Sequence, residues 1–308
     1  MKQLGGQILI QPLTIADYAR RHKLWACFCA LFFLIVFFSC ASAVYDILVL
    51  NEKAPLYALG AGMVGFAATA AGSIPGLFMN KLSDRTEDLM LGSAAGMMIA
   101  AAFFSLLMPA LEASDKLFAN EWLSMAWVIF GIFLGIVFLL GINAITPHEH
   151  FESGAEGPEI QVRDGIWLFV LAIIIHNVPE GMAMGISFAA EDMQIGVPLT
   201  AAIALQDLPE GLAVVLALCT TSISRVKAVM IGVLSGLMEP IGALFGVSLT
   251  AQLGYAYPLG LALSAGAMFF VVFHEVIPET HRRGHQTAAT LGLMFGFCLL
   301  MVLDRGLG

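Results

Sequence analysis

Apolar runs of about 20 residues recur along the 308-residue chain, and this repetition limits the fold more than any other feature. A helix of that length crosses the hydrocarbon core of a bilayer. Strands of a membrane barrel are about 10 residues long and alternate in polarity, which these runs do not. We therefore expect an all-α, polytopic membrane helical bundle. The nine runs cover residues 24–48, 57–79, 89–111, 123–145, 166–190, 197–220, 228–252, 258–279 and 287–304.

The composition agrees with a lipid bilayer as the surroundings, because 59% of the residues are hydrophobic and only 12% are charged. The formal net charge of -9 argues against nucleic acid as a partner, since phosphates attract basic surfaces. No GxxxxGK[ST] phosphate-binding loop occurs in the sequence, so we expect no ATP hydrolysis.

Lys and Arg are distributed unevenly between alternate connections. With the N-terminus inside, eleven of the 14 lie on the inner side. Cytoplasmic connections carry such an excess, so we place the N-terminus in the cytoplasm and the C-terminus outside. Residues 1–50 then form a basic N-terminus with one transmembrane helix, and residues 51–308 form the remaining bundle with a cytoplasmic loop over 146–164.

Pairs of glycines four residues apart recur in the apolar runs. Small residues at this spacing let membrane helices approach closely, either within one chain or between subunits. We favour packing within the chain for any single pair. The pairs are Gly92 and Gly96, Gly131 and Gly135, Gly232 and Gly236, Gly242 and Gly246, and Gly292 and Gly296.

Two related polar motifs interrupt the fifth and sixth runs, which contain neither Lys nor Arg. His176–Gly181 reads HNVPEG, and Gln206–Gly211 reads QDLPEG. In the seventh run Glu239 also precedes a proline. A charged side chain at the centre of a bilayer costs about 2.5–3.5 kcal/mol even on the lenient scale. These groups therefore need a partner or a function.

The helical period brings the polar members of each motif to one face, because residues three and four apart are neighbours on a helix. These members are His176, Asn177 and Glu180 in the first motif, and Gln206, Asp207 and Glu210 in the second. Imidazole, carboxamide and carboxylate groups that converge in a dry interior predict a metal site.

The prolines of the two motifs support this prediction. Pro179 and Pro209 each free the backbone carbonyl four residues earlier, and free carbonyls in lipid are tolerated where they line a cavity. Interrupted helices of this kind mark many transporter sites. The plainer alternative is a pair of kinked helices with polar packing residues.

Charge predicts the number of ions. Glu180, Asp207, Glu210 and Glu239 carry four potential negative charges in helices without basic residues. Crowded carboxylates in a low dielectric cannot all stay ionised without a positive partner. Two divalent ions neutralise the set, whereas one ion would require about two retained protons. We therefore predict two metal ions per chain.

Histidines also occur near the predicted inner side. His148 and His150 lie in the acidic 146–164 loop, which could receive a metal or simply be a solvated linker. His274 and Glu275 near the inner end of the eighth run could form a way-station for exit. The HExxH pattern of zinc proteases is incomplete there, because Pro278 stands in place of the second histidine.

At His176–Gly181 the sequence resembles the ZIP (Zrt-, Irt-like protein) metal transporters, and Gln206–Gly211 with Glu239 resembles their bacterial GufA-like branch. The resemblance extends from about residue 55 to the end. It implies eight helices in inverted repeats, uptake of divalent metal into the cytoplasm, and a homodimer in a bacterial cytoplasmic (inner) membrane. The first apolar run is an extra helix relative to this pattern.

The resemblance also implies a ligand set for each of two ions. The first ion would be held by His176, Glu180, Gln206, Asp207 and Glu210, with Met98 as a softer ligand. The second would lie among Asn177, Glu180, Asp207, Glu210 and Glu239. His148, His150, His274 and Glu275 fit the family's inner release route.

The cargo implied is a divalent metal, with Zn²⁺ first and Cd²⁺, Fe²⁺ or Mn²⁺ as alternatives. Nitrogen, oxygen and one thioether suit these ions better than Cu(I), but ligand type alone does not rank them. Gln206 and Asp207 stand where many family members have His and Glu, so selectivity does not carry over. We weigh an inward transporter, which is not an enzyme, against an intramembrane zinc metalloprotease and a proton-conducting or metal-sensing protein.

Overall fold

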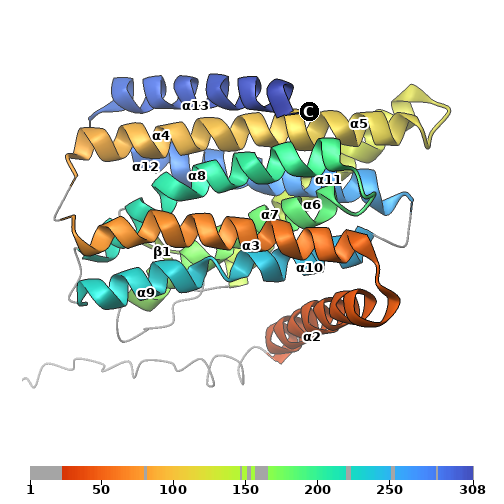
Figure 1. Ribbon diagram of the computed structural model, residues 1–308, viewed down its shortest axis with the longest axis horizontal. Helices are drawn as coiled ribbons and strands as arrows, with labels where there is room; N and C mark the ends of the chain where they lie inside the picture. Colours follow the sequence, from red (N-terminus) through yellow and green to blue (C-terminus); the bar gives the residue numbers. More distant parts are fainter. Residues whose placement is uncertain are drawn as a thin grey trace, which may run out of the picture.

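The computed structural model describes residues 23–79, 82–145, 148–150, 154–156, 166–219, 223–250, 254–281 and 284–307. Figure 1 shows a bundle of long helices that run roughly along one direction. The helical elements are α2 (Lys23–Tyr45), η1 (Asp46–Leu50), α3 (Lys53–Ser73), η2 (Ile74–Leu77), α4 (Asp84–Ala100), η3 (Ala101–Leu107), α5 (Met108–Asp115), α6 (Glu121–Ile145), α7 (Ile166–Ser187), α8 (Met193–Cys219), α9 (Arg225–Ser235), α10 (Met238–Thr250), α11 (Ala256–Val271), η4 (Val272–Val276), α12 (Ile277–His281) and α13 (Gln286–Leu307).

Each predicted apolar run falls on one helix or on consecutive helical segments, so the predicted all-α membrane bundle is confirmed. Among the described residues, eight stretches are long and apolar enough to cross a membrane, and α7 is a further apolar helix of 22 residues. Several helices begin before their apolar run. For example, α4 begins at Asp84, where Ser83 caps it by accepting a hydrogen bond from the Thr86 amide (3.1 Å). The polar residues of such a cap do not raise the hydropathy of the segment. The predicted apolar run therefore begins several residues after the helix does.

The loop predicted over 146–164 contains a short hairpin. Strand β1 (His148–His150) pairs antiparallel with β2 (Gly154–Glu156), and His148 lies opposite Glu156. β1 contacts α7, the helix that carries the first polar motif. His148 and His150 therefore lie in β1, and the loop residues other than β1 and β2 are outside the described residues.

The helices pack in two groups. The first helix group comprises α3, α7, α8, α9 and α10. The second comprises α4, α6, α11 and α13, together with the segments η3, α5, η4 and α12 that continue α4 and α11. The closest pairs lie within a group: α3 with α8 and α10, α7 with α10, α4 with α13, and α6 with α11. In Figure 1, α13 and α4 lie along one edge of the bundle, and α3, α9 and α10 lie along the other. The two groups meet where α4 contacts α8 and α7 contacts α11.

Glycines explain the tight packing inside each group. A Cβ added at Gly96 would strike the Leu293 carbonyl oxygen, and one at Gly185 would strike that of Ala243. Across the described residues, every glycine whose added Cβ would reach the backbone of another helix does so within its own group. Between the groups, Gly260 meets only side chains. The glycine pairs therefore pack helices of one chain together, as predicted.

Two π-helical interruptions have a local cause, and a third interruption separates α9 from α10. The π-helical segments η3 and η4 each end just before a proline, Pro109 and Pro278 respectively. A proline lacks an N–H and crowds the carbonyl four residues earlier, and the wider turn relieves both effects. The seventh run is broken outright between α9 and α10, where Gly236 and Leu237 leave the helix. This break places Glu239 in the first turn of α10, where the helix dipole favours a carboxylate.

The extra N-terminal helix α2 packs against α10. The Ser248 hydroxyl donates to the Ser39 carbonyl (2.9 Å), and the Cys40 thiol lies 3.6 Å from the Ile241 carbonyl oxygen. A small apolar cluster joins Ala43 to α3 and α10. In Figure 1, α2 lies at one corner of the bundle. Its contacts are therefore with the first helix group.

We expect Gly62→Ala to destabilise the fold and Gly60→Ala to leave it unchanged, although both lie in α3. A Cβ at Gly62 would lie 2.5 Å from Pro240 Cα, whereas none of the described atoms lies within 4 Å of one at Gly60. Overpacking of this kind costs about 1–3 kcal/mol. Thermal unfolding in detergent measures the difference. Equal melting temperatures for the two variants would show that α3 and α10 do not pack this closely.

Candidate metal centre

Two neighbouring helices bring three carboxylates together. Glu180 of α7 and Asp207 and Glu210 of α8 each offer one oxygen, and these atoms lie within 4.8 Å of one another. Glu180 and Asp207 are buried, with 1% and 2% of their surfaces exposed, and Glu210 is half-buried. Repulsion between such groups is strong in a low dielectric. The arrangement is suited to a multivalent cation.

Gln206 links the two motifs directly. Its Nε2 donates a hydrogen bond of 2.5 Å to Glu180 Oε1, and both residues are buried. The other end of the amide, Gln206 Oε1, has no hydrogen-bond partner among the described residues. The side chain thus orients one carboxylate and leaves its own acceptor oxygen available.

Three buried acceptor oxygens in this region have no hydrogen-bond donor in the described part of the chain: Gln206 Oε1, Asp207 Oδ2 and Glu239 Oε2. All three belong to residues predicted as metal ligands. A buried acceptor without a partner costs about 1–3 kcal/mol, and more when it is charged. A bound cation removes this cost, because oxygen lone pairs are what a hard or borderline metal ion takes.

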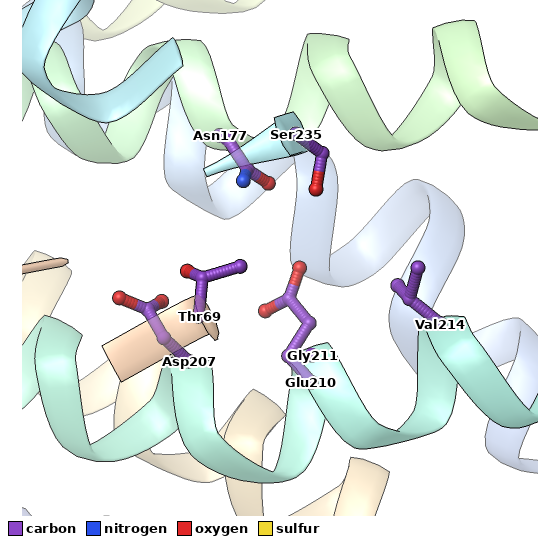
Figure 2. A pocket seen from close by; sticks show the side chains of 7 residues that line it. All are labelled: Thr69, Asn177, Asp207, Glu210, Gly211, Val214 and Ser235. Carbon is purple, nitrogen blue, oxygen red and sulfur yellow. The ribbon is translucent and has the colours of Figure 1, made fainter. Parts of the chain in front are cut away.

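A small pocket lies beside the carboxylates of Asp207 and Glu210. Its free volume of about 10 Å³ is the scale of a single water molecule or ion. Figure 2 shows Asn177 and Ser235 on one side of it and Asp207 and Glu210 on the other, with Thr69 between the two carboxylates. The lining is completed by Gly211 and Val214. All seven residues belong to the first helix group.

Glu239 reaches the same region from the first turn of α10. It is completely buried, and the Thr69 hydroxyl donates to its Oε1 at 2.6 Å. The motif-based prediction did not include Thr69 or Ser235. A single hydroxyl in an apolar helix carries no distinguishing signal, because most such groups bond to their own backbone.

His176 connects the centre to the second helix group. Its Nε2 contacts Glu275 Oε2 of η4, and Glu275 is buried. The adjacent His274 is exposed and stacks on Phe270, with ring centroids 4.7 Å apart. Only Glu275 of this predicted pair therefore reaches the central motifs in this conformation.

Met98 comes from the second helix group as well. It lies in α4, is 2% exposed, and belongs to the main apolar core. Its side chain is therefore buried inside the bundle. A thioether is a soft ligand and would add sulfur to a nitrogen and oxygen set.

Comparison with known proteins gives a consistent result. The family model described as ZIP Zinc transporter matches residues 146–304. The zinc transporter ZIPB of Bordetella bronchiseptica is 54% identical over 252 residues, which covers 82% of this chain and 82% of that protein. The zinc transporter GufA of Myxococcus xanthus is 39% identical over 254 residues, 81% of this chain and all of that protein.

A more distant relative, the human zinc transporter ZIP11, is 29% identical over 321 residues, 78% of this chain and 94% of that protein. The matches therefore extend over most of the chain. They agree with a helical membrane bundle whose interior collects carboxylates, an amide and an imidazole. The chain belongs to the ZIP family of divalent-metal transporters, in its bacterial GufA-like branch.

Proposed function

We propose that this membrane transporter carries Zn²⁺ into the cytoplasm through a two-metal centre between α7, α8 and α10. The observation that supports it most is the set of three buried acceptor oxygens on Gln206, Asp207 and Glu239 that have no hydrogen-bond donor among the described residues. Uptake of divalent metal is the activity of the family. Zn²⁺ is the cargo named for the relatives, while Cd²⁺, Fe²⁺ and Mn²⁺ fit the same oxygen and nitrogen ligands.

The two ions share carboxylates. The first would take His176, Glu180, Gln206, Asp207 and Glu210, with Met98 completing the set. The second would take Asn177, Glu180, Asp207, Glu210 and Glu239. Shared carboxylates act as bridges, and two divalent ions balance the four negative charges. Binding would release protons from any carboxylic acids that the empty centre retains.

Release would proceed from His176 towards the inner side. The contact between His176 and Glu275 supplies a competing partner for the imidazole, so that one histidine can pass from the ion to the carboxylate. His274 follows on η4, and the 146–164 loop contributes His148 and His150. The side chain of Glu275 thus stands at the first step of the exit route.

Alternating access would come from sliding of one helix group against the other. The glycines that bring two helix backbones into close contact do so within one group. At Gly260, where the two groups approach each other, only side chains make the contact. The central pocket lies wholly in the first helix group, while Met98 and Glu275 belong to the second. A relative movement would therefore change the ligands available to a bound ion.

The orientation with a cytoplasmic N-terminus, the inner membrane of a bacterium and a homodimer remain predictions. Fluorescent metal and pH indicators inside reconstituted vesicles test direction and proton coupling together. The protease alternative has no support, because Pro278 occupies the second histidine position of the HExxH pattern and the relatives are named as transporters.

We expect His176→Ala and Asp207→Ala each to lower Zn²⁺ uptake by more than about 10-fold, since even outer partners of metal ligands are worth 10–100-fold. Each removes an anchoring ligand of the centre. Met98→Ala should have a smaller effect. Uptake is measured in proteoliposomes with matched protein content. Wild-type rates in the His176 variant would refute the site assignment.

Metal content tests the number of ions. We expect wild-type protein at neutral pH to hold two central ions, and Glu239→Ala to hold one, because Glu239 serves only the second position. Transport by this variant should be reduced but not abolished. Elemental analysis of purified protein gives the stoichiometry. A single central ion in the wild type, unchanged by the substitution, is incompatible with a two-metal centre.

The histidines of the hairpin should tune release rather than perform the crossing. Replacing His148 and His150 together by Ala should lower the uptake rate or alter its regulation while uptake persists. Vesicle assays over a range of Zn²⁺ concentrations check this expectation. Complete loss of uptake in well-expressed, folded protein would make the two histidines an obligatory site.

A further inference from the structure

The carboxylate of Glu239 is held by α3, a helix that carries neither polar motif. Thr69 Oγ1 donates to Glu239 Oε1 at 2.6 Å across 170 residues of sequence. Thr69 is 6% exposed and Glu239 is completely buried. In such surroundings a hydrogen bond from a hydroxyl holds the carboxylate strongly, because no water competes for the oxygen.

Gly65 completes the support one turn earlier on the same face of α3. A Cβ at this position would fall on Glu239 Oε2 and would lie 2.9 Å from both the Glu239 carboxyl carbon and Met184 Cε. Gly65 and Thr69 are four residues apart and so share a helix face. Together they form a cradle for the carboxylate: Gly65 leaves the space, and Thr69 supplies the hydrogen bond.

The cradle donates a hydrogen bond to only one oxygen of Glu239. Oε1 accepts from Thr69, whereas Oε2 lies against Gly65 and has no hydrogen-bond donor among the described residues. Thr69 also lines the pocket with Asn177, Asp207 and Glu210. One hydrogen bond therefore fixes the rotamer of the carboxylate beside the pocket without occupying both of its oxygens.

Other buried threonines do not behave in this way. Thr200 donates to the Gly196 carbonyl (2.7 Å) and Thr250 to the Gly246 carbonyl (3.0 Å), each in its own helix. Thr69 instead bonds to a carboxylate of another helix. This choice of partner distinguishes a positioning role from ordinary helix packing.

We propose that Gly65 and Thr69 are positioning residues that set Glu239 for the second metal ion before that ion binds. The inference rests on the proposed two-metal centre and deepens it. An outer partner that orients a metal ligand is worth about 10–100-fold in metal affinity. The affinity for the second ion, rather than for the first, should therefore depend on the Thr69 hydroxyl.

The test compares Zn²⁺ binding by purified full-length protein, measured by titration calorimetry and elemental analysis. We expect Thr69→Val to weaken the binding of the second ion by about 10–100-fold and to leave the affinity for the first ion unchanged. Thr69→Ser should bind both ions as the wild type does. Thr250→Val is the matched control, since it removes a buried hydroxyl of α10 that bonds to its own helix. Its binding should equal that of the wild type.

Combination with Glu239→Gln shows whether Thr69 acts through the carboxylate. The double variant Thr69→Val, Glu239→Gln should bind like Glu239→Gln alone, because the hydroxyl has lost its charged partner. Additive losses, or two ions of wild-type affinity in Thr69→Val, would overturn the proposal while the two-metal centre stands. One central ion in the wild type would overturn both. Gly65→Ala gives an independent check and should also weaken only the second ion.

Discussion

Four carboxylates in an apolar helical interior are the constraint on which the rest of the structure depends. Glu180, Asp207 and Glu239 are almost fully buried, and their helices supply no Lys or Arg between residues 166 and 220 or 228 and 252. The imidazole of His176, in the same helix as Glu180, contacts Glu275. Their negative charge therefore calls for an external cation.

The interrupted helices let polar groups sit in the membrane while most of the backbone stays hydrogen-bonded. The break before α10 brings Glu239 to a helix start, where exposed N–H groups and the dipole favour a carboxylate. The π-helical segment η4 carries Glu275 and ends before Pro278. In both cases, an irregular stretch of helix carries a side chain of the candidate centre or its exit route.

Much of the candidate centre could be predicted from the sequence, because the helical period is a local property. The spacing within HNVPEG and QDLPEG was sufficient to put Asn177 and Glu180, and then Asp207 and Glu210, on common faces. The hydroxyl of Thr69 could not be found in this way. Within one sequence it looks like Thr200 and Thr250, which bond to their own helices, and only its partner sets it apart.

The sequence by itself determined the class of protein, the membrane-spanning segments and the polar face of each motif helix. Hydrophobic length and the 3.6-residue period fix these features without reference to neighbours. Only the tertiary structure decided that α3 cradles Glu239, that Glu275 reaches His176 across 99 residues, and that close glycine contacts divide the bundle into two groups. These relations depend on which helices become neighbours, and that follows from the packing of small side chains across the whole bundle.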